Sequence, residues 1–462
     1  MGDGYEQFYR TWCYSGRSVS GADGWKVRAK SDGLPLPEAE GMGDLASYWC
    51  PTEFSRETPP GRRLALFRRQ NDSVLVHGAP VAGLVGGRGG VSFEHGVVGL
   101  PKGVSALEAV RLWRSPAWRV EDGSFSPKLE RFAWDVVARG PFFQVQPGGA
   151  SSRAGDDGVA LEILNRGDVM PWGAYVIRAC LAAADGTVEK VFLAGKDDTI
   201  VRLLFLAFYC LPERLRSKLT FSTHENPKAT KGVQIVGVTA FEGEEADLPR
   251  HCYEGKYWAL NIYNGKQTES LCASFFAEAA IQWILCGQFE LLAAVRANFD
   301  KLDPADNPGV AELDLLAEHS PMGGDAPAGT EGLLKLCGSA AIGHAKLRDR
   351  NEFRSLIRAA QNDNKVKEGL VTQFRKWLPS HGVASEELPK QMAEAGFEGL
   401  VEGGSFEDLV WLGEFGGRLG NCEQKYWEEL LMRCHEGIGS ATFFPALKTR
   451  IGLIGRWEKW HR

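Results

Sequence analysis

The sequence predicts a multidomain α+β protein with a β-rich N-terminal domain, an α/β middle domain and an all-α C-terminal region. The chain has 462 residues, and a domain usually takes roughly 150, so about three domains are expected. Its apolar content of 44% and charged content of 24% are typical of an ordinary soluble globular protein. The spacing of apolar residues changes twice along the chain. We therefore expect domains at residues 1–147, 155–300 and 333–462.

The first domain is predicted from short β-type runs separated by turn residues. These runs cover residues 7–14, 24–29, 63–68, 74–76 and 97–100. The pair Asn71-Asp72 predicts a hairpin between the third and fourth runs. Ser105 and Glu108 have the spacing of a capping box, so a helix is predicted to begin at Ser105.

The middle domain is predicted from alternating helical and β-type runs. It follows a Gly- and Ser-rich segment at residues 146–152, which favours a domain boundary. We expect helices at 174–183 and 199–210 and strands at 188–193, 219–222 and 233–238. Asp197 or Asp198 is expected to cap the second of these helices.

The last part of the chain is predicted to be helical. Apolar residues recur at helical spacing over residues 270–298, which indicates one long amphipathic helix. Residues 303–332, rich in Pro, Gly and Asp, are expected to form a mobile connector. Residues 333–462 are expected to form a helical bundle or a short solenoid.

One stretch is the strongest candidate for a functional site. Four glycines surround one arginine, and a histidine follows shortly after: the residues are Gly86, Gly87, Arg88, Gly89, Gly90 and His95. Glycines at such density indicate positive φ angles or close approach to another group. A guanidinium on such a turn can bind a phosphate, a carboxylate or a protein partner. Equally, Arg88 can pair with an acidic neighbour, and His95 can be a hydrogen-bonded structural residue rather than a general base.

These residues also carry a family resemblance. Gly87-Arg88-Gly89-Gly90, followed by Phe93 and His95, resembles the Gly-Arg-x-Gly motif of the GTPase-associated proteins of bacterial conflict systems. The segments 24–34 and 211–223 are similar to the same family. The match covers about the first 270 residues.

The resemblance implies a function. Proteins of this family act with separately encoded GTPases, so the chain is expected to be a non-catalytic adaptor, regulator or sensor in anti-phage defence. Its partners would be a GTPase and other subunits of the conflict system. Val91 stands where the family commonly has a polar residue. The C-terminal region resembles no family.

Two other functions remain open. A hydrolase could use His95 or a cysteine in a cleft between the first two domains. A nucleic-acid sensor could use Arg62, Arg63, Arg68 and Arg69. Against the sensor, residues 1–150 have 18 basic and 16 acidic side chains, a weak positive charge for nucleic-acid binding. The same arginines would protect a solvated strand edge.

The sequence favours a protein without enzymatic activity, cofactor or metal. The phosphate-binding G-x-x-x-x-G-K-[ST] motif is absent, and so are H-E-x-x-H and G-x-S-x-G. The ten cysteines form no C-x-x-C pair, so neither a zinc site nor a disulfide framework is indicated. His251 and Cys252 are adjacent, and on a strand they would point to opposite faces. With no apolar signal core and no membrane-spanning run, we expect a cytoplasmic protein.

Overall fold

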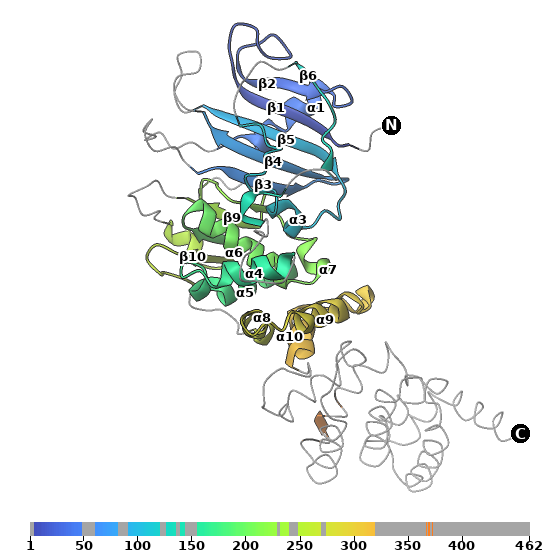
Figure 1. Ribbon diagram of the computed structural model, residues 1–462, viewed down its shortest axis with the longest axis vertical. Helices are drawn as coiled ribbons and strands as arrows, with labels where there is room; N and C mark the ends of the chain where they lie inside the picture. The colour runs from blue at the N-terminus through green and yellow to red at the C-terminus, as the bar shows by residue number, and fades with distance from the viewer. Residues whose placement is uncertain are drawn as a thin grey trace, which may run out of the picture. The chain divides into compact units, whose positions relative to one another are not determined.

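The computed structural model describes residues 4–48, 61–81, 91–120, 126–134, 139–143, 155–228, 232–239, 248–268 and 274–318, together with positions 366, 368, 369 and 372. Residues 1–296 form one compact unit, and residues 297–462 form a second unit. The first unit is built on a ten-stranded sheet with the order β10-β7-β9-β8-β3-β4-β5-β1-β2-β6 (Figure 1).

The sheet is mixed, and its two halves differ in strand direction. Strands β1 to β5 pair with one another in antiparallel fashion, whereas β8, β9, β7 and β10 are parallel. The two halves meet where β3 pairs antiparallel with β8. The strands are β1 (Glu6–Cys13), β2 (Gly24–Ser31), β3 (Arg63–Arg68), β4 (Ser73–Pro80), β5 (Ser92–Leu100), β6 (Lys128–Leu129), β7 (Lys190–Ala194), β8 (Phe221–Ser222), β9 (Ile235–Val238) and β10 (Tyr257–Asn261).

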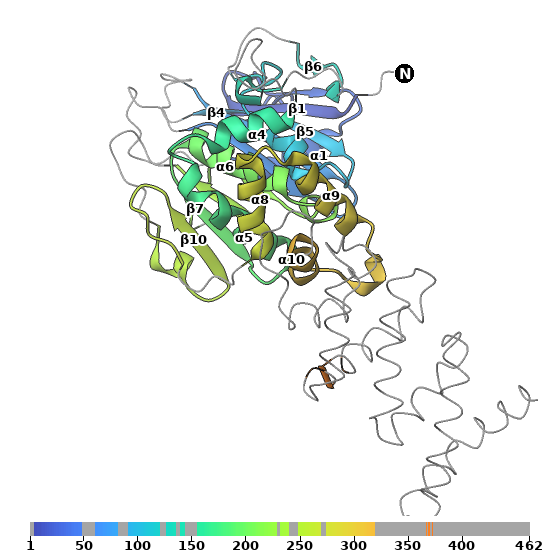
Figure 2. The ribbon, with the colours of Figure 1, turned by 60° about the horizontal axis from the view of Figure 1, so that its bottom comes forward.

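Helices cover both faces of this sheet. On one face, α1 (Leu36–Gly41) and α2 (Gly43–Ala46) contact β2, β4 and β5. On the other face lie α3 (Ala106–Val110), α5 (Gly173–Asp185) and α6 (Asp197–Cys210), which contact β3, β7 and β9. Helices α4 (Asp156–Leu164) and α8 (Phe275–Leu285) pack on α5 and α6 (Figure 2). The remaining helices are α7 (Glu213–Arg216), α9 (Phe289–Asp300) and α10 (Val310–Glu318), with short 3-10 turns at η2 (Pro141–Phe143), η3 (Met170–Trp172), η4 (Arg250–Tyr253) and η5 (Pro304–Asp306).

The predicted α+β class is confirmed, and the N-terminal region is rich in strands. All five β-type runs expected in the first domain are strands, and the hairpin at Asn71-Asp72 joins β3 to β4. The capping box is present, because the Ser105 hydroxyl accepts from the Glu108 N–H and the Glu108 carboxylate accepts from the Ser105 N–H. Local signals were therefore sufficient for these elements.

The prediction of one long helix over residues 270–298 is wrong. The chain forms two helices there, α8 and α9. Gly287 has a φ of +70°, and its N–H donates to the Ile284 carbonyl at 3.0 Å. The N–H of Gln288 donates to the Trp283 carbonyl at 2.7 Å, which completes a Schellman motif that ends α8. The apolar spacing continues across the break, which is why the sequence pattern did not reveal it.

Two further expectations concern the chain beyond residue 300. Part of the expected connector at 303–332 is ordered, because η5 and α10 lie within it. The expected helical domain at 333–462 lies outside the described residues, apart from helical positions 366, 368, 369 and 372. No described helix has the length and apolar composition needed to cross a membrane.

The expected boundary at residues 147–155 remains a prediction, and the structure adds one fact to it. Both sides of this boundary contribute strands to the same sheet, through the pairing of Ala65 with Ser222 and of Leu66 with Phe221. Any two domains divided at this point therefore share a sheet.

Candidate functional site

The described residues on either side of the glycine-rich stretch lie at one end of the sheet. Residues Gly86, Gly87, Arg88, Gly89 and Gly90 lie outside the described residues. The strands on either side are described, and the Val81 N–H donates to the Val91 carbonyl at 2.8 Å. At this end of the sheet β4, β7, β8, β9 and β10 stop and β3 and β5 begin. We call it the carboxyl end, and in open α/β sheets ligands bind at this end.

His95 lies in the interior on β5. The Arg119 N–H donates to its Nδ1 at 3.2 Å, so Nε2 carries the proton and donates to the Gln7 Oε1 at 2.7 Å. The rings of Tyr9, Trp118 and Phe132 meet the imidazole edge to face. Burial lowers the pKa of His95 to about 3. The imidazole is therefore neutral near pH 7, with both nitrogens already hydrogen-bonded.

Glu94, which precedes His95, is held by three donors. One carboxylate oxygen accepts from the Arg10 guanidinium at 2.7 Å. The other accepts from the Tyr48 N–H at 2.9 Å and from the Ser92 hydroxyl at 3.0 Å. These hydrogen bonds join the first residues of β5 to Arg10 of β1 and to the chain at Tyr48. Glu94 is the one acidic residue in the otherwise mostly apolar sequence of β5, and this pattern could have indicated a buried, hydrogen-bonded carboxylate.

Arg63 overturns the expectation of a solvated strand edge. It lies on β3, a central strand, and its side chain is fully buried. Its guanidinium donates to Glu225 at 2.5 and 3.0 Å, to the Ser222 hydroxyl at 3.2 Å and to the Ala46 carbonyl at 3.0 Å. Glu225 is also buried, and its Oε2 has no hydrogen-bond partner. The pair joins the two halves of the sheet.

The other arginines of the expected cluster separate. Arg68 donates to the Ser73 hydroxyl at 2.7 Å and to the carbonyls of Lys102 and Val104. Arg69 binds Asp72 at 2.6 Å and Glu38 at 3.1 Å. The side chains of three of the four arginines therefore take part in internal contacts, and the Arg62 side chain forms no hydrogen bond or ion pair within the described residues.

A second polar cluster lies at the carboxyl end, beyond Arg63. The Tyr48 ring stacks on the His224 ring, with centroids 5.0 Å apart, and the Tyr48 hydroxyl donates to the Gly61 carbonyl at 2.5 Å. His224 Nδ1 is hydrogen-bonded to the Thr239 hydroxyl. Sequence reasoning missed His224 and Glu225, although both follow directly after the segment 211–223 that carries the family resemblance.

Two buried cysteines, Cys210 and Cys252, are poorly suited to act as nucleophiles. His251 and Cys252 lie on a 3-10 turn rather than a strand, and Cys252 Sγ lies 3.6 Å from His251 Nε2. The expectation that these two side chains point to opposite faces assumed a strand, so it does not hold on this turn. Burial raises the pKa of the Cys252 thiol to about 11 and that of Cys210 to about 12. Both remain thiols near pH 7, and a thiol is a weak nucleophile.

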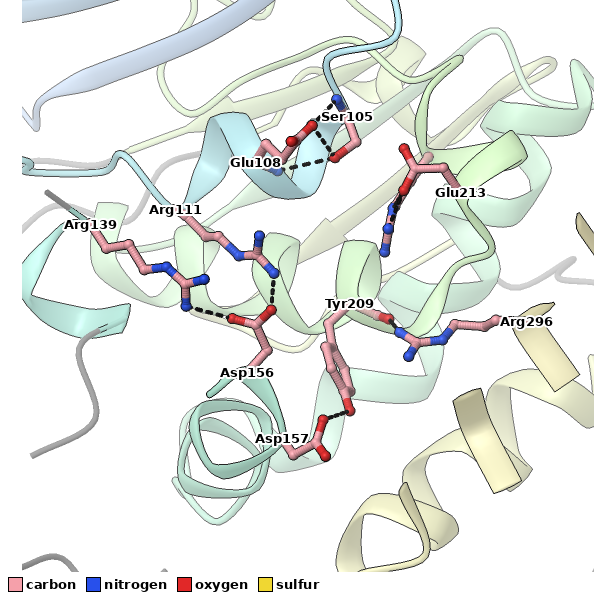
Figure 3. A network of polar contacts seen from close by, with 10 residues as sticks. Ser105, Glu108, Arg111, Arg139, Asp156, Asp157, Tyr209, Glu213 and Arg296 are labelled. Carbon is pink, nitrogen blue, oxygen red and sulfur yellow. Dashed lines mark hydrogen bonds and ion pairs between the residues drawn. The ribbon is translucent and has the colours of Figure 1, made fainter. Parts of the chain in front are cut away.

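A further network joins the helices on the α3 face (Figure 3). Asp156, at the start of α4, binds Arg111 and Arg139, while Asp157 accepts from the Tyr209 hydroxyl at 2.7 Å. Burial, together with the neighbouring charges of Arg139 and Arg216, lowers the pKa of Arg111 to about 10. Arg296 donates to the Tyr209 carbonyl. The network connects α3 with α4, α6 and α9, and within it Asp156 is paired with two arginines.

The helix start at Asp197 differs from the expectation. Lys196 is the N-cap residue, and no side-chain cap bond forms there. Asp197 and Asp198 occupy the first turn instead, where carboxylates are favourable to the helix dipole. Arg114 binds both, at 3.4 and 3.0 Å.

Comparison with known families gives the identity of the first two regions. No group of metal-binding side chains occurs among the residues that the structure describes. A family model described as GTPase-associated protein 1, N-terminal domain type 2, matches residues 4–129. A second, described as GTPase-associated protein 1, middle domain, matches residues 161–253. Comparisons with curated proteins and with solved structures gave no match. The chain therefore carries a GTPase-associated protein 1 N-terminal domain of type 2, followed by a GTPase-associated protein 1 middle domain.

Proposed function

We propose that the protein is a non-catalytic adaptor or regulator of a bacterial conflict system and acts in the cytoplasm with a separately encoded GTPase. The two family matches carry this proposal, because both matched domains are described as GTPase-associated. The glycine-rich stretch from Gly86 to Gly90, which contains Arg88, is the proposed contact with the GTPase. The helical C-terminal region is proposed to dock further subunits.

The chemistry of the described residues supports a role without catalysis. His95 has both ring nitrogens hydrogen-bonded and a pKa of about 3. The buried thiols of Cys210 and Cys252 have raised pKa values. General bases and nucleophiles work best with a pKa near the working pH, and none of these groups meets that condition.

The first experiment is to purify the tagged full-length protein from its own host and identify co-purifying GTPases by mass spectrometry. The GTPase is then produced separately and titrated with the wild-type protein by calorimetry, and its GTP hydrolysis rate is measured with and without the protein. We expect binding, a changed hydrolysis rate, and a loss of both in Arg88→Ala.

The matched control is Arg17→Ala, which removes an exposed arginine that stacks on Tyr14 within the same region. It should bind the GTPase as the wild type does. The absence of any GTPase from the purified material would contradict the proposal. So would hydrolysis of a substrate by the protein alone that is lost in His95→Gln.

A further inference from the structure

The α3 face of the sheet carries a fully buried histidine whose ring nitrogens have no partner. His77 lies on β4, between Leu64 of β3 and His95 of β5. Its side chain is 0% exposed, and neither Nδ1 nor Nε2 has a hydrogen-bond partner. The ring stacks on Trp118 with centroids 5.3 Å apart. Leaving a buried polar atom without a partner is costly, so such an atom points to a missing group.

Arg62 lies beside this histidine at the carboxyl end. In the β3–β4 register, Leu64 is opposite His77, so Arg62 reaches the same face two positions further along. Its charge and that of Arg114 both lower the pKa of His77, in addition to burial. The Arg62 side chain is half-buried and forms no hydrogen bond or ion pair within the described residues.

The charges around the first turn of α6 do not cancel. Arg114 binds Asp197 and Asp198, while Arg166 and Arg202 bind Asp168 at 3.5 and 3.7 Å. Each of these three aspartates has an ion-pair partner. Four arginines and three aspartates therefore gather here, with the exposed Lys196 at the N-cap of α6. Arg62 is the arginine of this group that has no ion pair within the described residues.

The local backbone is also unusual. Arg114 has a φ of +56°, a conformation that is rare for residues other than glycine and that gathers at binding sites. Trp113, just before it, donates from its indole nitrogen to Asp198 at 3.2 Å and lies 6.5 Å from the His77 ring. These contacts hold the aspartates toward Arg114. Burial lowers the pKa of Arg62 and the charges of Asp197 and Asp198 raise it, but neither aspartate forms an ion pair with it within the described residues, so its guanidinium can bind another anion.

We propose that Arg62 and His77 bind an oxyanion of a small molecule at the carboxyl end of the sheet, on its α3 face. The guanidinium supplies the charge, and the imidazole supplies one N–H donor. A single negative charge here balances the excess charge of Arg62. Phosphate and carboxylate groups both have this chemistry. The proposal does not depend on the proposed GTPase contact at Arg88.

The test uses the full-length protein with two probes, inorganic phosphate and malonate, at constant ionic strength. Binding is measured by calorimetry and by the shift in melting temperature. We expect one probe or both to bind, and Arg62→Gln to weaken binding on the order of tenfold or more, as loss of a charged hydrogen bond does. His77→Phe should weaken binding likewise while raising the melting temperature of the ligand-free protein, because it removes two unpartnered nitrogens.

The control is Arg69→Gln, which changes an arginine at the end of β3 that is already paired with Asp72 and Glu38. It should bind the probe with unchanged affinity. Tighter binding of phosphate than of malonate assigns a phosphate ligand, and the reverse assigns a carboxylate. Failure of both probes to bind the wild type, or equal binding by the wild type, Arg62→Gln and His77→Phe, would overturn the proposal.

Discussion

At the scale of single residues, burial keeps the imidazole rings of the sheet neutral. His95 has a pKa of about 3 in the folded protein, whereas an unfolded histidine titrates near 6.5. As the pH falls below about 6.5, the unfolded chain takes up a proton that the folded chain does not, so stability falls. The pKa of His77 is lowered in the same direction by burial and by the nearby Arg62, His95 and Arg114.

We therefore predict that His95→Gln makes stability less dependent on pH. Between pH 7 and pH 5 the wild type should lose about 2 kcal/mol more than the variant, the linkage energy of one histidine over that window. Urea unfolding at the two pH values measures the difference. Equal losses in both proteins would show that His95 is protonated in the folded state.

A second residue-scale prediction concerns the buried pair Arg63–Glu225. Arg63→Met leaves the Glu225 carboxylate buried without its guanidinium, and we expect a loss of about 3–5 kcal/mol in unfolding free energy. Adding Glu225→Leu should restore part of this loss. The control Arg250→Met removes an exposed pair with Glu254 and should cost about 0–1 kcal/mol. Additive effects of the two buried changes would argue against coupling.

At the scale of elements, local signals predicted strands and helix starts well. The residues of β3 and the capping box at Ser105 follow from propensity and short-range hydrogen bonds. The position of β3 in the sheet could not be predicted in this way, because Ala65 pairs with Ser222 far along the chain. For the same reason the sequence did not single out Glu225 or His77, because their contacts are with residues that are distant in the sequence.

The end of α8 provides an element-scale prediction. Gly287 has a positive φ, and an alanine in that conformation costs about 1–2 kcal/mol. We expect Gly287→Ala to lower the unfolding free energy by that amount, and Gly287→Asn to lower it less. Gly167→Ala is a suitable control, because Gly167 has open space around its Cα and no positive φ. The unfolding free energies of the three variants are compared with that of the wild type by thermal unfolding. Equal losses for Gly287→Ala and Gly167→Ala would show that the positive φ at Gly287 does not matter for stability.

At the scale of the whole molecule, the two family domains share one sheet. The core of residues on the α1 face contains Phe8 and Val27 from the first domain together with Val236 and Val238 from the second. The sequence predicted the two regions from their composition, and the family matches agree with that order. It could not predict the shared sheet, because the pairing of β3 with β8 leaves no local pattern.

We predict that cutting the chain between the two family domains does not separate them. A protease site inserted after Gly149 allows specific cleavage of the purified protein. The two pieces should elute together in size-exclusion chromatography without denaturant, because β3–β8 pairing and Arg63–Glu225 hold them. Elution as two separate peaks would contradict a shared core.

The antiparallel pairing of β3 with β8 also has a consequence for synthesis. When the ribosome has made the first 100 residues, β3 has β4 on one side and nothing on the other, because its second partner begins only at Phe221. An unpaired strand edge of this kind binds other chains readily. The nascent N-terminal half therefore needs shielding, by a chaperone or by rapid translation, until the middle domain emerges.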